Sequence, residues 1–226
     1  MNQRSIVALT GLLLVVYAAW LVYLGLVLPP ARADAMFSET GWFEDLSAVF
    51  WLVLAVILLF ARPIGLGRRI GMSVIAAVLA AREEGWHKKF TTDSLFKSDY
   101  YQMTGVPLAE KLIAGAVAVG LTITLVWLLV LGGREVFARG GWRRPWGWLA
   151  LFAVAISPIL KAVDRGPSIL RVQFDITLSE NIDMVMLSLE EGMESALPVL
   201  FLLALGLYLM DRRSGSATPV TDGLHG

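Results

Sequence analysis

Long apolar runs separated by short polar links dominate the pattern of hydrophobic and polar positions along this chain. An α-helix of about 20 apolar residues is long enough to cross the hydrocarbon core of a bilayer. The runs predict six such helices, over about residues 6–28, 43–61, 69–87, 107–131, 146–162 and 183–210. The expected fold class is therefore all-α, a polytopic integral membrane helical bundle with a single transmembrane domain over residues 1–210. Residues 211–226 read as a disordered cytoplasmic tail.

Two of the predicted helices leave alternatives open. The first apolar run, Ile6 to Leu28, ends at Pro29-Pro30 and is followed by small residues that resemble a signal-peptide cleavage site. Because the run is longer than the usual apolar region of a signal peptide, we favour an uncleaved helix. The third run, Ile70 to Ala81, has only 12 residues, so this helix must continue through Arg82–Glu84 toward His87 in order to span.

The connection after the fifth helix also has a distinctive pattern. That helix is interrupted by Ser157-Pro158, and the 20 residues from Ala162 to Asn181 form a long connection. Apolar residues alternate with polar ones there, which is typical of an extended strand. We expect either a short strand or an extended flap over the helix ends.

Charged residues are distributed unevenly about the predicted helices. With the N-terminus inside, the cytoplasmic segments carry ten Lys and Arg residues against three acids, and the other side carries nine against sixteen. Cytoplasmic links of membrane proteins are enriched in Lys and Arg. The short basic links therefore predict that both termini are cytoplasmic.

The amino-acid composition limits which residues can bind a metal ion. The chain of 226 residues has no cysteine and two histidines, so any metal site must be rich in carboxylates. Five of the predicted helices place ionisable residues at the outward-facing end. Glu84-Gly-Trp-His87 matches the Glu-x-x-His spacing that helical bundles use for metal ligands. We expect Glu84, His87, Glu190 and Glu194 to hold one divalent ion, Zn, Mn or Fe, with Glu83 or Glu191 as the general base.

Two other interpretations of the same acids stay open. Arg82, Lys111 and Lys161 lie in the same predicted layer, so structural ion pairing between helices is one alternative role for the acids. Carboxylates inside a membrane can also form a proton or cation pathway.

Three stretches resemble motifs of small uncharacterised bacterial inner-membrane proteins. They are SETGWFED (38–45), REEGWHKKFTT (82–92) and LEEGMESALP (189–198). This resemblance covers about a third of the chain. It implies a multi-pass fold in a bacterial inner membrane and brings no activity.

The function expected from these observations is that of a membrane protein with an acidic site at its outer face. The leading hypothesis is a metal-dependent enzyme acting on a lipid or lipid-linked substrate. The alternatives are an ion- or proton-coupled transporter and a structural subunit of a membrane complex. Membrane lipid is the expected partner, with further subunits or a second copy of the chain also open. The basic links are too short to suggest nucleic-acid binding.

Overall fold

The computed structural model describes residues 2–38, 41–86 and 92–215, and over these residues it is built from helices without a β-strand. The elements follow in chain order: α1 (Gln3–Val27), α2 (Pro30–Phe37), α3 (Trp42–Phe60), α4 (Leu66–Glu83), α6 (Ser98–Gln102), α7 (Leu108–Gly133), the π-helical turn η1 (Arg134–Ala138), the 3-10 turn η2 (Gly141–Arg143), α8 (Pro145–Phe174) and α9 (Glu180–Gly215). The prediction of an all-α membrane bundle is confirmed.

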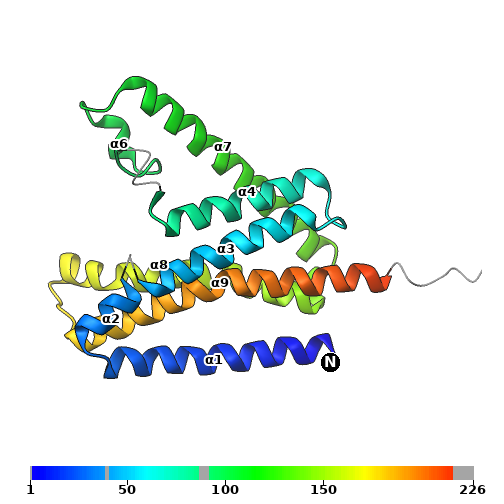
Figure 1. Cartoon of the computed structure of the whole chain (residues 1–226), viewed down its shortest axis with the longest axis horizontal. Helices are drawn as coiled ribbons and strands as arrows, with labels where there is room; N and C mark the ends of the chain where they lie inside the picture. The colour runs from blue at the N-terminus through cyan, green and yellow to red at the C-terminus, as the bar shows by residue number, and fades with distance from the viewer. Residues whose placement is uncertain (1, 39–40, 87–91, 216–226) are drawn as a thin grey trace, which may run out of the picture.

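Five of the described helices are long and apolar enough to cross a membrane. They are α1, α3 with the residues before it, α7 with η1, α8 and α9. Of the six predicted membrane helices, only the one that corresponds to α4 is not apolar enough to be among these five. Its 18 residues include ionisable side chains at both ends. Figure 1 nevertheless shows the start of α1 and the end of α9 at the same end of the bundle. Because five crossings would leave them at opposite ends, α4 also runs between the two ends.

α9 is the central helix of the bundle. It packs against α1, α2, α3 and α8 (Figure 1), and its side chains contribute to both larger apolar clusters of the protein. Trp51 of α3 meets Phe201 of α9 with ring centroids 5.8 Å apart. Two glycines allow α1 and α9 to approach closely, since a Cβ on Gly192 would overlap the side chain of Leu21 and one on Gly25 would meet Ser188 and Val185. The stretch that the sequence marks as acidic and then apolar therefore holds the bundle together.

The end of α4 differs from the prediction. The helix does not continue to His87, because Glu84 caps it and Gly85 adopts a φ of +62°. A glycine with positive φ directly after the last turn is a common helix stop. The amide of Gly85 donates to the carbonyl of Arg82, as expected for such an ending. The helical Glu-x-x-His spacing is thus interrupted.

The connection between the last two helices also differs from the prediction. α8 does not stop near Lys161 but continues through Pro158 and Pro167 to Phe174. It ends at Asp175, whose φ is +54°. Only residues 175–179 lie outside a helix, so the strand or flap predicted over 162–181 was wrong. Pro158 does not break the helix: α8 runs on through it, and in the preceding turn Ser157 Oγ donates to the carbonyl of Ala153.

α8 and α9 are longer than a membrane crossing requires. Their 30 and 36 residues correspond to about 45 and 54 Å at 1.5 Å per residue, against a hydrocarbon core of about 30 Å. Each of these helices therefore extends beyond a core of that thickness at one end or at both. At its other end α9 extends to Gly215, so the first residues of the predicted tail are helical. Residues 216–226 lie outside the described part of the chain.

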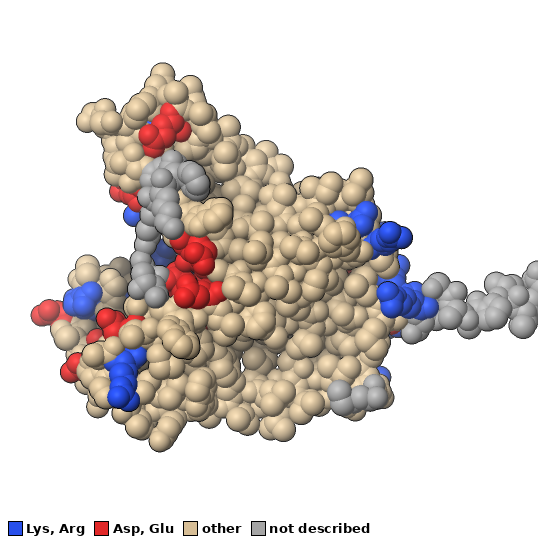
Figure 2. Space-filling model, in the orientation of Figure 1, with Lys and Arg blue, Asp and Glu red and all other residues tan. Residues whose placement is uncertain are grey.

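The two ends of the bundle differ in charge. Figure 2 shows lysines and arginines gathered near the end of α9, and most visible acids toward the opposite end. At the basic end, Glu135 accepts from Arg139 at 2.7 Å and from Arg212 at 2.5 Å, and it lies 4.0 Å from Arg68. This carboxylate thereby joins α4, η1 and α9. The asymmetry agrees with the uneven charges of the sequence.

Candidate functional site

The first half of α9 presents carboxylates to two different neighbours. Glu190 and Glu194 are one turn apart and face α8, where both approach Lys161. Glu191 is rotated by about 100° from Glu190 and lies toward α3 and α4. An acidic helix start is favourable in itself, since the helix dipole attracts negative charge. Positions 190–194 are well inside the helix, however, and their charges need other partners.

Lys161 of α8 supplies part of that compensation. Its ammonium nitrogen lies 3.1 Å from Glu194, 3.1 Å from Asp164 and 3.5 Å from Glu190. The side chains of Glu194 and Glu190 are only 15% and 11% exposed, whereas that of Lys161 is 39% exposed. The structural ion pairing that the sequence left open is therefore present for these two glutamates. A single lysine serves three carboxylates.

Glu191 lies in the centre of the remaining acids. Its carboxylate interacts electrostatically with Glu190 and Glu194 on its own helix, and with Glu44 at the start of α3 and Glu83 at the end of α4. Glu83 in turn interacts with Glu194, Arg82 and Lys161. We call Glu44, Glu83, Glu190, Glu191 and Glu194 the carboxylate cluster. Among the described residues, no lysine or arginine forms an ion pair with Glu191.

The predicted site residues are thus only partly brought together. Glu83, Glu190, Glu191 and Glu194 belong to the carboxylate cluster. Glu84 is exposed on the turn after α4, and His87 lies outside the described residues. Glu44, in the first turn of α3, was not among the predicted site residues, although an acid at the start of an apolar run is visible in the sequence.

Lys111, which belongs to the predicted layer, and its neighbour Glu110 lie elsewhere. The carboxylate of Glu110, at the start of α7, accepts from the amide and hydroxyl of Thr92 and, at 2.9 Å, from the hydroxyl of Tyr100. Lys111 donates to the carbonyls of Tyr101 and Met103. Both residues hold the segment before α7 in place and do not join the carboxylate cluster.

Tyr100 is fully buried where its hydroxyl donates to Glu110. Burial, followed by the hydrogen bond to Glu110, raises the pKa of Tyr100 to about 12. The phenol is therefore protonated at every physiological pH and remains a donor to the carboxylate.

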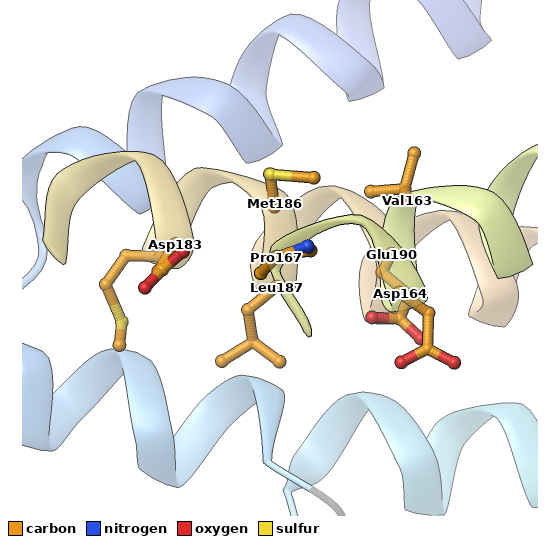
Figure 3. A pocket seen from close by; sticks show the side chains of 8 residues that line it. Val163, Asp164, Pro167, Asp183, Met186, Leu187 and Glu190 are labelled. Carbon is orange, nitrogen blue, oxygen red and sulfur yellow. The ribbon is translucent and has the colours of Figure 1, made fainter. Parts of the chain in front are cut away.

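A cavity of about 250 Å³ lies between α8 and α9, beside the carboxylate cluster. Figure 3 shows Asp183 at one end of its lining residues and Asp164 and Glu190 at the other, with Pro167, Met186 and Leu187 between them. The sequence marked the acids but could not show this cavity, because it depends on α8 continuing past Lys161.

No three acidic or histidine side chains of the described residues are arranged closely enough to hold a metal ion as they stand. Like-charged carboxylates repel one another unless a cation or protons compensate them. To serve as ligands, the members of the carboxylate cluster would have to close around an ion by changes of side-chain rotamer. The cluster can attract a cation, exchange protons, or hold the helices together through Lys161.

Comparison of the chain with protein-family models, curated proteins and solved structures finds no match.

Proposed function

We propose that this membrane protein binds a divalent cation in the carboxylate cluster, and that the bound ion serves an enzymatic reaction on a lipid or lipid-linked substrate. The observation that supports the proposal is the charge around Glu191. Carboxylates from three helices surround it, and Lys161 pairs with only two of them. An ionised carboxylate at the membrane edge is costly unless it is paired, protonated or hydrated. A divalent cation would supply the missing positive charge.

The ligand set proposed here is centred on Glu191 and Glu83, with Glu44 as a further oxygen donor. Carboxylate oxygens favour hard ions such as Mn or Mg over Zn. Glu190 and Glu194 are less suitable as ligands, because Lys161 already pairs with them. An ion held in this way can polarise a phosphoryl or carbonyl oxygen and lower the pKa of a bound water, and a neighbouring carboxylate can accept the proton.

The position of the cluster supports a lipid or lipid-linked substrate. In this proposal the acids lie where the long helices α8 and α9 leave the hydrocarbon, which is the depth of lipid headgroups. The other half of α9 buries apolar side chains, among them Leu200, Ala204 and Leu207. Within the described residues it offers no chain of carboxylates to the opposite face, which disfavours the transporter hypothesis. A bacterial inner membrane remains part of the proposal through the resemblance of the three stretches. The basic end shown in Figure 2 supports cytoplasmic termini.

The ion pairs of Lys161 favour a second candidate, a structural role within a membrane complex. Both candidates are tested by incubating the purified protein with a panel of labelled lipids and lipid-linked phosphates, with and without chelator. Metal-dependent turnover that Glu191→Gln abolishes and Glu84→Gln preserves would support the enzyme. If no lipid is altered and chelation leaves the stability of the protein unchanged, the structural role is favoured instead.

A further inference from the structure

The cavity between α8 and α9 has an acid at each end and an apolar wall between them. Asp183 and Glu190 are seven residues apart on α9, which corresponds to about 10 Å along the helix. Asp164 of α8 lies beside Glu190, because Lys161 contacts both carboxylates. Pro167, Met186 and Leu187 occupy the space between the two ends (Figure 3).

Neither acidic end is fully satisfied by the protein. Glu190 is only 9% exposed, and its contact with Lys161 is 3.5 Å, longer than the usual 2.7–3.2 Å of a hydrogen bond. At the other end Asp183 Oδ1 is enclosed and has no hydrogen-bond partner among the described residues. The dipole of α9 favours a charge at Asp183, but it does not supply the missing donor. A buried acceptor without a donor is unfavourable, so both ends favour a ligand that carries N–H groups.

We propose that this cavity binds an aliphatic diamine or polyamine, with one ammonium group at Asp183 and another at the Asp164–Glu190 end. Each ammonium offers three donors and a positive charge. The methylene chain between the ammonium groups packs against Pro167, Met186 and Leu187. A metal ion cannot contact acids that are about 10 Å apart, and an anionic headgroup would be repelled by all three. The site does not depend on the cation proposed for Glu191, which lies on another face of α9.

Calorimetric titration of the purified full-length chain in detergent tests this inference, with 1,4-diaminobutane, 1,5-diaminopentane and spermidine as probes. Butylamine is the control ligand with a single ammonium group. Saturable binding of at least one diamine or polyamine is expected, at least tenfold tighter than butylamine. Asp183→Asn should weaken it at least tenfold. The matched control is Glu180→Gln, an exposed acid one turn away on the same helix, which should bind as the wild type does.

Two further variants decide the outcome if Asp183→Asn affects folding. Met186→Phe should block the apolar middle of the cavity and abolish binding without removing a charge. Glu191→Gln should retain diamine binding, even if it loses a metal ion. Equal affinity for diamines and butylamine, equal behaviour of Asp183→Asn and Glu180→Gln, or absence of saturable binding would each overturn the inference.

Discussion

Lys161 on α8 lies 3.1 Å from Glu194 on α9, and a second ion pair, between Arg144 and Asp211, joins the same two helices at 2.9 Å. The two pairs are 17 residues apart on both helices, from 144 to 161 and from 194 to 211. At 1.5 Å per residue this separation is about 26 Å, close to the thickness of the hydrocarbon core. The two ion pairs are therefore spaced as the two borders of a membrane would be, and Glu190 and Glu194 of the carboxylate cluster lie at the Lys161 pair.

Replacing Lys161 with methionine should destabilise the bundle. Glu190 and Glu194 would lose their shared cation, and we expect a loss of about 1–2 kcal/mol, less than for a fully buried pair because Lys161 is partly exposed. Thermal unfolding in detergent measures the effect. Arg165→Met is the matched control, because this arginine is exposed on the same helix. Equal melting temperatures for the two variants would show that the Lys161 pairs do not stabilise the fold.

Gly25→Ala should weaken the contact between α1 and α9. The new Cβ would lie 2.6 Å from Ser188 Oγ and 2.7 Å from the backbone of Val185, so a side-chain rotation alone cannot relieve the overlap. A loss of about 1–3 kcal/mol is expected. Gly11→Ala on the same helix has nothing within 4 Å of its new Cβ and should be neutral or stabilising by up to about 1 kcal/mol. Comparing the free energies of unfolding of the two variants checks the close contact between α1 and α9. A Gly25→Ala protein as stable as the wild type would refute it.

Tyr100→Phe should loosen the segment before α7, because Glu110 would lose the donor held by the buried phenol. We expect faster hydrogen exchange and proteolysis within residues 92–106, with Tyr23→Phe, an exposed tyrosine, as the control. The raised pKa of Tyr100 sets the pH window. The contribution of the protonated Tyr100 phenol to stability is fully present below pH 10 and is lost as the pH rises toward 12. Identical hydrogen-exchange protection in Tyr100→Phe and Tyr23→Phe would show that the Tyr100–Glu110 hydrogen bond does not hold this segment.

Single cysteines can test the arrangement of the two ends, since the chain has none of its own. Ser5→Cys and Arg143→Cys should be labelled from one side of the membrane by an impermeant maleimide. Ser98→Cys and Ser168→Cys should be labelled from the other side. All four positions are exposed in the structure. Labelling of Ser98→Cys from the same side as Ser5→Cys would mean that α4 does not run between the two ends.

The sequence was sufficient to predict the helical bundle, because apolar runs of membrane length have few other stable structures. It also identified Glu190, Glu191 and Glu194 as unusual, since acids inside a membrane helix are costly. Local backbone conformation was harder to predict. The glycine after Glu84 stops α4, whereas the prediction extended this helix toward His87 because its apolar run of 12 residues is too short to span.

The continuation of α8 was missed for a different reason. Proline usually ends a helix, and the alternation from Val172 to Leu178 is typical of a strand. α8 nevertheless stays helical through Pro158 and Pro167, and its extension lies against α9, where a Cβ on Gly166 would meet Met186. The cavity beside the cluster depends on this continuation, so it could not be predicted from the order of residues alone.

The central claim is that the carboxylate cluster binds a divalent cation at Glu191. A double replacement of Glu190 and Glu194 is a poor test, because it also removes the partners of Lys161. Glu191→Gln is cleaner, since no described cation pairs with this residue.

The most direct measurement is the metal content of the purified, folded protein after equilibration with Mn and exchange into metal-free buffer. We expect about one ion per chain in the wild type and in Glu84→Gln, and a stoichiometry near zero in Glu191→Gln. No bound ion in the wild type, or an unchanged stoichiometry in Glu191→Gln, would contradict the proposed cation site.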